Sequence, residues 1–253
     1  MATYLDDIVA AHRTYPQPSV TDAAIAAAPA VRGFAAALQA ADGLAVIAEI
    51  KRRSPSMGEM APDLDPALMA KAYADGGAVA LSVLTDADYF GGSPDDLVAA
   101  RAAVDLPVLR KDFTVCEGDV RAARAMGADA VLLIVAALDD AELRNFHDAA
   151  IALGMAALVE VHDEAELARA AAVDARVVGV NQRDLHTFAV DHERALRMAD
   201  AIPAGVVRVA ESGVRDAADA QRLRDAGYAA ILVGQTLVTA GDPAETVRSL
   251  RCS

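Results

Sequence analysis

The hydrophobic pattern of the chain repeats one unit: a short apolar, β-branched run that ends in a polar residue or glycine and leads into an alanine-rich helical segment. Successive runs begin about 20 to 35 residues apart, the length of one strand-plus-helix unit. The eight runs are 46–51, 79–85, 107–111, 130–135, 156–161, 177–181, 206–212 and 229–234. Near-continuous apolar runs separated by helix-length segments are typical of parallel strands covered by helices. The pattern therefore predicts an α/β fold, a closed (β/α)8 TIM barrel.

The first 45 residues precede the first predicted strand and read as a helical extension. Residues 3–12 have a helical pattern, a Pro-rich break follows at 15–18, and a helical period returns over 19–41, with Ser19 or Thr21 as its N-cap. Such an extension closes the floor of the barrel or overhangs its mouth, and its composition favours a packing role. We predict one domain over residues 1–253, with the extension over 1–45 and the barrel over 46–253. The length matches the roughly 250 residues typical of this fold.

Composition and charge narrow the possible partners. No uninterrupted apolar stretch reaches the roughly 18 residues of a membrane span, and the N-terminus has acids where a signal peptide needs bases. We therefore expect a soluble, cytoplasmic protein that binds no membrane. A net charge of −14 argues against binding to nucleic acid. Cys116 and Cys252 are far apart and have no second pair, so neither a disulfide framework nor a zinc site is expected.

Seven charged or amide side chains fall at the ends of predicted strands, where parallel barrels place their chemistry. Glu49 and Lys51 lie two apart on the first strand, so they share a face and point into the barrel mouth together. The other five are Lys111 at the third strand, Glu160 at the fifth, Asn181 and Arg183 at the sixth, and Glu211 at the seventh. Any one alone is explained equally well as a solvated or ion-paired strand end. Seven at one mouth predict an active site.

Two short loops carry a phosphate signature. Ser212-Gly213 follows the seventh strand and Gly234-Gln235 follows the eighth. Glycines let backbone N–H groups approach an anion, and short helix N-termini add a favourable dipole. Alone, these would be ordinary turn glycines. Their position after strands seven and eight predicts a phosphate site, because barrels often hold a substrate phosphate there.

The five histidines are not expected to act as acids or bases. His12, His147 and His192 fall in predicted helices, and His162 and His186 fall in loops near the predicted mouth. None of them ends a strand. We therefore interpret each as an exposed or helix-end residue.

Seven segments together resemble the indole-3-glycerol-phosphate synthase family. They are AEIKRRSPSMG (48–58), LSVLTDADYFGGS (81–93), PVLRKDF (107–113), LVEVHDEAEL (158–167), GVNQRDLHTFAVD (179–191), AESGV (210–214) and LVGQTLV (232–238). The resemblance covers the chain from about residue 44 onward, and family members also carry helices before the first strand. Its most specific motif is Glu-x-Lys-x-x-Ser-Pro-Ser, which places an acid, a base and a phosphate-side loop in one short window.

The resemblance implies a carboxy-lyase of tryptophan biosynthesis. Its substrate would be 1-(2-carboxyphenylamino)-1-deoxyribulose 5-phosphate, which closes to indole-3-glycerol phosphate with loss of carbon dioxide and water by general acid-base catalysis. By the family's pattern, Lys111 would protonate the ketone oxygen while Glu160 holds it, and Lys51 and Glu49 would serve dehydration. Which lysine acts in which step is not decided by the sequence.

The resemblance also assigns binding residues. Asn181 and Glu211 would orient the ribulose hydroxyls, and Arg183 would lie near the substrate carboxylate. The phosphate would bind Ser212, Gly213, Gly234 and Gln235, with Lys51 and Ser54 above them. The aromatic ring would sit against Phe90, Phe113, Leu185 and Phe188, although ordinary loop packing explains these four without the resemblance. The family needs neither cofactor nor metal, and a monomer is expected, with a dimer through alanine-rich helices as the alternative.

Two other classes of function share parts of this pattern. A sugar-phosphate isomerase barrel would have the same two phosphate loops, but it would usually pair an aspartate or cysteine with another acid, whereas this chain offers lysines. A noncatalytic scaffold barrel would be expected to have lost mouth residues. The sequence meets neither expectation.

Overall fold

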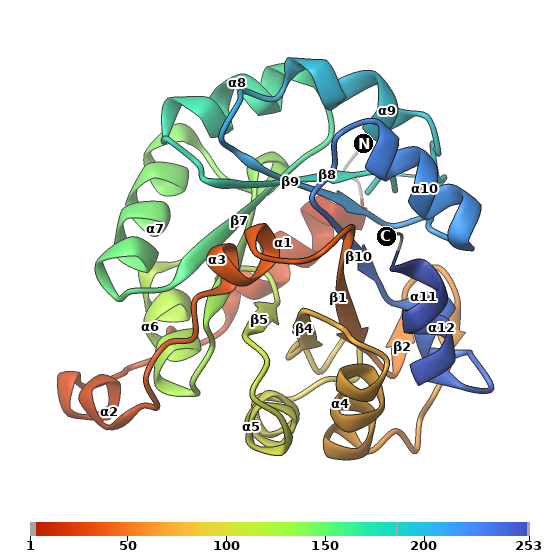
Figure 1. Ribbon diagram of the computed structural model, residues 1–253. Coiled ribbons are helices and arrows are strands. Elements are labelled where there is room, and N and C mark those ends of the chain that lie inside the picture. Colours follow the sequence, from red (N-terminus) through yellow and green to blue (C-terminus); the bar gives the residue numbers. More distant parts are fainter. Residues whose placement is uncertain (1–3, 186, 252–253) are drawn as a thin grey trace.

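The computed structural model describes residues 4–185 and 187–251. Eight parallel strands close into a barrel in the order β1-β10-β9-β8-β7-β6-β5-β4 (Figure 1). The strands are β1 (Ala45–Ile50), β4 (Ala80–Leu84), β5 (Val108–Lys111), β6 (Ala130–Ile134), β7 (Ala156–Val161), β8 (Val177–Asn181), β9 (Val207–Glu211) and β10 (Ala230–Val233). Each predicted strand is present, and no boundary differs by more than one residue. The TIM-barrel prediction is confirmed.

Helices follow the strands and cover the outside of the barrel (Figure 1). They are α4 (Pro66–Asp75), α5 (Pro94–Ala103), α6 (Glu117–Ala125), α7 (Asp140–Ala152), α8 (Glu164–Ala172), α9 (Arg194–Met198), α10 (Ala217–Asp225), α11 (Gln235–Val238) and α12 (Pro243–Leu250). Polar caps fix several starts: Asp65 caps α4, Ser93 caps α5 in a capping box, and Asp163 caps α8. A covering helix or a short helical turn joins each strand of the barrel to the next along the chain.

Strand alternation divides the core into two apolar layers. On β1, Val46, Ala48 and Ile50 belong to the layer between strands and helices, while Ala45 and Ile47 belong to the layer inside the barrel. Glu49 is the next inward position after Ile47. The same alternation that fills the barrel with apolar side chains therefore delivers a carboxylate to the top of its interior.

Three helices precede the barrel: α1 (Tyr4–Thr14), α2 (Asp22–Ala27) and α3 (Phe34–Gln39). Thr21, not Ser19, caps α2 by accepting a hydrogen bond from the Ala24 N–H. The predicted helical period over 19–41 is wrong as a continuous element, because Pro29 forces the residue before it out of the helical region and Ala28 is extended, with ψ of 149°. The predicted start at Thr3 lies outside the described residues.

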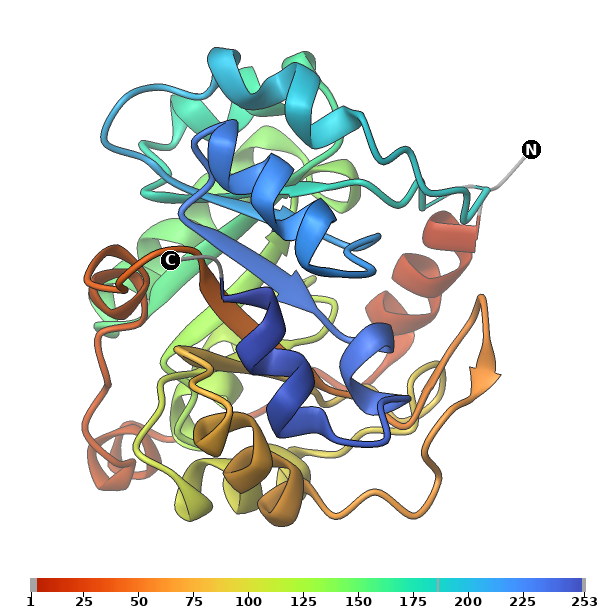
Figure 2. The same ribbon diagram turned by 45° about the vertical axis from the view of Figure 1, so that its right-hand side comes forward.

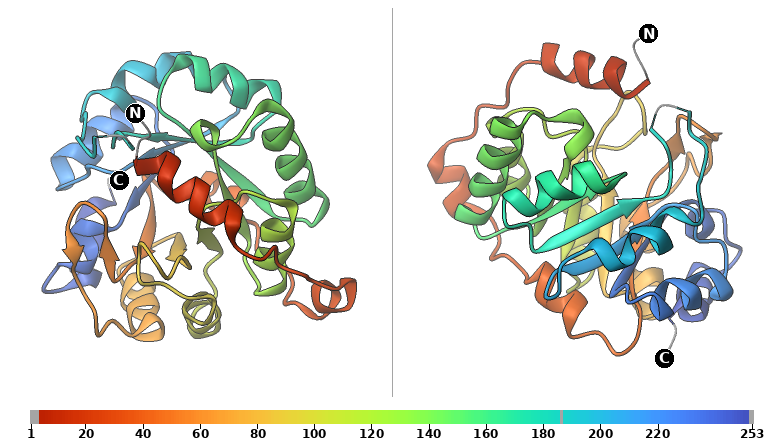
Figure 3. Two further views of the ribbon diagram at one scale, coloured as in Figure 1. Left: turned by 180° about the vertical axis from the view of Figure 1, so that it is seen from behind. Right: turned by 90° about the horizontal axis from the view of Figure 1, so that it is seen from above.

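The N-terminal helices lie at opposite ends of the barrel. Phe34 and Leu38 of α3 pack against the inward-facing side chains of the strands and close the floor. Helix α1 crosses the other end, as the view from behind shows (Figure 3). The sequence left two places open for the N-terminal segment, the floor of the barrel and its mouth. In the structure, α3 lies at the floor and α1 lies at the mouth.

An additional element lies in the loop after β1. Strands β2 (Arg53–Ser54) and β3 (Gly58–Glu59) form a short antiparallel hairpin that the sequence pattern does not predict. Figure 2 shows this hairpin and α1 at one end of the barrel and α3 at the other. No helix in the described part of the chain is both long and apolar enough to cross a bilayer.

Candidate active site

A cavity of about 290 Å³ opens at the carboxyl ends of the strands. Its walls come from the strand ends, the loops that follow them and the inner face of α1. Barrel register decides which strand ends meet: Asn181 of β8 pairs with Glu211 of β9, and Leu84 of β4 pairs with Lys111 of β5. The cavity therefore lies where the fold gathers side chains from many separate segments.

One acid-base centre surrounds Lys111. Its Nζ lies 3.8 Å from Oε2 of Glu160 and 3.9 Å from Oε2 of Glu211. Burial disfavours the charged ammonium, but the carboxylates of Glu160, Glu211 and Glu49 outweigh it and raise the pKa of Lys111 above that of an ordinary lysine. The ammonium form of Lys111 is thus favoured, and it can act as a donor in the cavity.

A second centre is the ion pair between Lys51 and Glu49, with 2.6 Å between Nζ and Oε1. Burial favours the neutral form of Glu49, but the charges of Lys51 and Lys111 lower its pKa below the usual value. Glu49 is therefore a carboxylate, able to accept a proton, and it lies next to a cation able to donate one.

The third carboxyl group, Glu211, is in a different state. Burial and the neighbouring Glu160 raise the pKa of Glu211 well above its ordinary value, against the opposing charge of Lys111. Oε1 of Glu211 is also buried without a hydrogen-bond partner. Unpartnered buried oxygens are rare in folded proteins, so this oxygen of a cavity-lining residue marks a place built to receive a donor from a ligand.

Two glycines make room for the carboxylates. A Cβ at Gly179 would overlap Oε1 of Glu211, and a Cβ at Gly234 would overlap Oε1 of Glu49 and lie 3.1 Å from Nζ of Lys51. Gly234 has φ of −116°, so its lack of a side chain, not its backbone conformation, is what the site requires.

The loops after β9 and β10 form the wall where a phosphate site is predicted. Ser212, Gly213, Gly234 and Gln235 all line the cavity, together with Ser54 from the β2–β3 hairpin. Ser212 has φ of 65°, a left-handed conformation that costs energy for a residue with a side chain. Gly234 and Gln235 begin α11, whose leading N–H groups have no partner within the helix and so point toward the cavity end of the barrel.

An apolar wall faces the charged one. The four predicted ring contacts, Phe90, Phe113, Leu185 and Phe188, all line the cavity. Sequence reasoning missed the part that α1 adds, which is Tyr4, Leu5 and Ile8. The Tyr4 ring meets Phe188 edge-on at 4.9 Å between centroids. The spacing of Leu5 and Ile8 indicates a buried helical face, but nothing in the sequence indicates which end of the barrel it covers.

The predicted acid-base and amide residues come together at the cavity, except that Glu160 does not line it. Glu49, Lys51, Lys111, Asn181, Arg183 and Glu211 line the cavity, whereas Glu160 does not. Glu160 is 1% exposed and lies beneath the wall, where its Oε1 accepts a hydrogen bond from Nδ2 of Asn181 at 3.1 Å. It therefore contacts Asn181 and Lys111 and is not exposed to the cavity itself.

The interpretation of the histidines as exposed or helix-end residues is wrong at three positions. His192 lies in a turn before α9 and lines the cavity. His147 is buried in the middle of α7, and His162 is partly buried next to Glu160. Helical and strand patterns locate a residue along its own element, but these environments come from elements distant in sequence. His186 lies outside the described residues.

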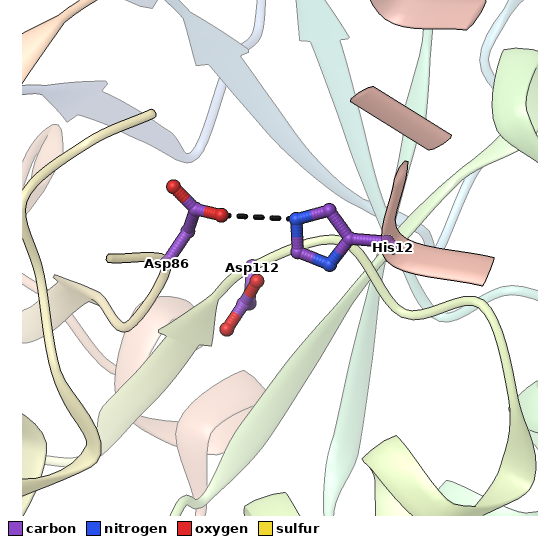
Figure 4. Close-up of side chains that lie close together, drawn as sticks. All are labelled: His12, Asp86 and Asp112. Atoms are coloured by element: carbon purple, nitrogen blue, oxygen red, sulfur yellow. Dashed lines mark hydrogen bonds and ion pairs between the residues drawn. The ribbon is translucent and has the colours of Figure 1, made fainter. Parts of the chain in front are cut away.

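The remaining histidine, His12 of α1, joins a cluster with Asp86 and Asp112 beside the apolar wall. Its Nε2 is 2.9 Å from Oδ2 of Asp86, and Figure 4 shows the ring directed at that carboxylate. Atoms of the three residues lie within 4.8 Å of one another, close enough for a metal. The carboxylates already accept bonds from backbone N–H groups of Tyr89 and Phe113, so we interpret the cluster as an anchor that holds α1 over the mouth.

Comparisons with known proteins agree on one family. The family model "Indole-3-glycerol phosphate synthase" matches residues 2–250. The enzyme of that name from Micrococcus luteus is 50% identical over 252 residues, covering 98% of this chain and 94% of its own. Indole-3-glycerol phosphate synthase 2 of Streptomyces coelicolor is 55% identical over 225 residues, covering 89% and 87%.

Solved structures show a similar fold at low identity. Thiamine phosphate pyrophosphorylase from Pyrococcus furiosus matches with a TM-score of 0.61 and 17% identity, covering 82% of this chain and 93% of that one. The N-acetylmannosamine-6-phosphate 2-epimerase from Clostridium perfringens has the same TM-score at 14% identity, covering 79% and 89%. At such identities the likeness concerns the barrel alone.

Proposed function

We propose a division of catalytic roles in this cavity from one premise: the chain belongs to the indole-3-glycerol phosphate synthase family. It is accordingly a carboxy-lyase of tryptophan biosynthesis. The reaction converts 1-(2-carboxyphenylamino)-1-deoxyribulose 5-phosphate to indole-3-glycerol phosphate, carbon dioxide and water. The ring carbon that bears the carboxylate attacks the ketone carbon, the carboxylate leaves, and a hydroxyl then departs. Negative charge develops on the ketone oxygen and later on the departing hydroxyl, and both need a proton donor.

Lys111 protonates the ketone oxygen during ring closure. Its raised pKa favours the charged ammonium, so the donor is in place before the substrate arrives. Glu160, beneath the cavity wall, holds the ammonium from below at 3.8 Å. Preorganised charge of this kind lowers the barrier because it needs no rearrangement as the alkoxide forms.

Lys51 and Glu49 carry out dehydration. The ammonium of Lys51 assists departure of the hydroxyl from the former ketone carbon, and the carboxylate of Glu49, whose pKa is lowered, takes the proton from the adjacent methylene carbon, which is bonded to the nitrogen. Nζ of Lys51 and Oε1 of Glu49 lie 2.6 Å apart. The same ion pair therefore gives a proton to the departing hydroxyl and takes one from the substrate carbon. Two separate lysine-carboxylate centres thus match a reaction with two separate bond-breaking stages.

The remaining wall residues bind and orient the substrate. Asn181 and Glu211 orient the ribulose hydroxyls, and Glu211, with its raised pKa, offers a proton as well as an acceptor oxygen. Half-buried Arg183 pairs with the substrate carboxylate until it leaves. Ser54, Ser212, Gly213, Gly234 and Gln235, together with Lys51, hold the phosphate, and Phe90, Phe113, Leu185 and Phe188 press the aromatic ring toward the ketone.

One observation supports this proposal above the others. Both lysine-carboxylate centres, the two phosphate loops and an apolar wall face one cavity of about 290 Å³. We further propose that the enzyme acts as a monomer in the cytoplasm, and light scattering after size exclusion tests its oligomeric state.

The test separates the two chemical stages in Lys51→Ala. Indole formation, followed by ultraviolet absorbance, should fall by about two powers of ten. Carbon dioxide release should fall much less, because the ring-closed intermediate loses its carboxylate before it loses its hydroxyl. Equal loss of both signals would contradict the assignment of Lys51 to dehydration. A folded wild-type enzyme that releases no carbon dioxide from this substrate would overturn the proposed chemistry altogether.

Gly234→Ala should lower kcat by about tenfold or more, since a Cβ there displaces the Glu49 carboxylate and misplaced groups of this kind cost up to about a hundredfold. Gly241→Ala is the matched control, because a Cβ at Gly241 meets nothing within 4 Å. Steady-state kinetics of both variants give the comparison. If Gly234→Ala turned over within about twofold of wild type, Glu49 would not need its observed position.

A further inference from the structure

His162 lies beside Glu160 and is absent from the cavity wall. It follows β7 immediately and comes two residues after Glu160. Its Nε2 is 3.7 Å from Oε1 of Glu160, and its Nδ1 is 3.0 Å from Oε2 of Glu166 on α8. The side chain is only 13% exposed. The imidazole therefore lies between two carboxylates, one of them in contact with the Lys111 centre.

The hydrogen-bonding capacity of the ring limits its protonation state. Glu166 accepts a hydrogen bond from the His162 backbone N–H at 2.7 Å and from Nδ1 as well, which places a proton on Nδ1. A neutral ring would then turn the lone pair of Nε2 toward the Glu160 carboxylate. Nε2 is buried with no hydrogen-bond partner, so that repulsion would go unrelieved. A proton on Nε2 converts it into attraction.

The charges around the ring favour the same state. Burial disfavours the imidazolium, yet Glu166 and Glu160 together raise the pKa of His162 above its ordinary value, against the opposing charge of Arg194 on α9. Lys111 lies 3.8 Å from Oε2 of Glu160, whereas Nε2 of His162 lies 3.7 Å from Oε1. Each oxygen of the Glu160 carboxylate therefore has one of these two basic groups beside it.

We propose that His162 is a positioning residue: as an imidazolium fixed by Glu166, it holds Oε1 of Glu160 and so sets the place of the Lys111 ammonium at Oε2. This inference rests on the proposed role of Lys111 in ring closure. It concerns a residue that does not touch the substrate, because His162 is absent from the cavity wall.

A pair of substitutions separates the two ring nitrogens. In His162→Asn the amide nitrogen takes the place of Nδ1 and keeps the bond to Glu166, while nothing replaces Nε2. In His162→Gln the amide nitrogen reaches the place of Nε2 and can still donate to Glu160. His147→Asn, at a buried histidine of α7 outside the cavity, is the control.

We expect His162→Asn to lower kcat by about tenfold with KM changed by less than about twofold, and His162→Gln to recover most of that loss. The pH profile carries the decisive information. Because the pKa of His162 is raised, wild type holds the proton below it, and kcat should fall as the pH rises through it. Both variants should lack that alkaline fall, whereas His147→Asn should keep it.

The outcomes distinguish this inference from the proposed function. Wild type without turnover defeats the function. Wild-type turnover with an unchanged kcat and pH profile in both His162 variants defeats only the role of His162. So does an equal loss in both variants with the alkaline fall retained, since that pattern is one of packing. Nitrogen NMR of the ligand-free enzyme adds a test independent of turnover, because the His162 ring should keep protons on both nitrogens to a higher pH than an ordinary histidine does.

Discussion

Lys111→Ala should lower kcat/KM for ring closure by about two to four powers of ten, the range expected for loss of a positioned proton donor. Among the described residues, Lys111 is the one lysine or arginine that forms an ion pair with Glu160 and Glu211. Its removal takes away both the proton and the charge that stabilises the forming alkoxide. Indole absorbance and carbon dioxide release should fall together, since Lys111 acts before the carboxylate leaves.

Rescue and a matched lysine show whether the loss is chemical. The sequence has three lysines, Lys51, Lys71 and Lys111, and Lys71 is exposed on α4 outside the cavity. Lys71→Ala should keep wild-type kinetics. Added ethylamine should restore part of the activity of Lys111→Ala by occupying the vacated space. A folded Lys111→Ala enzyme within about tenfold of wild type would rule out Lys111 as the proton donor.

Asp129→Ala should destabilise the fold by about 3 to 5 kcal/mol, the cost of leaving a buried charge without its partner. Asp129 is fully buried before β6, at the end of the barrel opposite the cavity. Its carboxylate accepts hydrogen bonds from the backbone N–H groups of Arg32 and Val108 and from Nη2 of Arg101, at 2.7 to 3.1 Å. The substitution strands all three donors and unties the N-terminal extension from the barrel floor.

Urea unfolding gives the measurement, with Asp105→Ala as the control. Asp105 lies 3.8 Å from the same arginine, Arg32, but its side chain is fully exposed, so its loss should not change the midpoint. Asp129→Asn keeps the shape of the side chain and one acceptor oxygen. Its urea midpoint should therefore lie between those of wild type and Asp129→Ala. Since Asp129 is remote from the cavity, kcat below the unfolding transition should stay near wild type. A wild-type urea midpoint in Asp129→Ala would show that the three donors find other hydrogen-bond partners.

The sequence determined the eight strands and most of the cavity wall. Strand position follows from short β-branched runs, and the inward or outward direction of a side chain follows from alternation. Alternation by itself therefore puts Glu49 and Lys51 on one face, where they form an ion pair. Parallel strands in a barrel share one carboxyl end. That rule alone gathers Lys111, Asn181 and Glu211, which come from different strands, at one mouth.

Only the tertiary structure decided which neighbours each side chain has. It set α1 over the mouth and α3 under the floor. It also placed Glu160 beneath the wall, His192 in the wall and His162 next to Glu160. These facts depend on packing between elements far apart in the chain, and on the register in which the barrel closes. Periodicity is a property of one segment and carries no record of such distant contacts, which is why a partly buried histidine next to Glu160 has the sequence pattern of an ordinary loop residue.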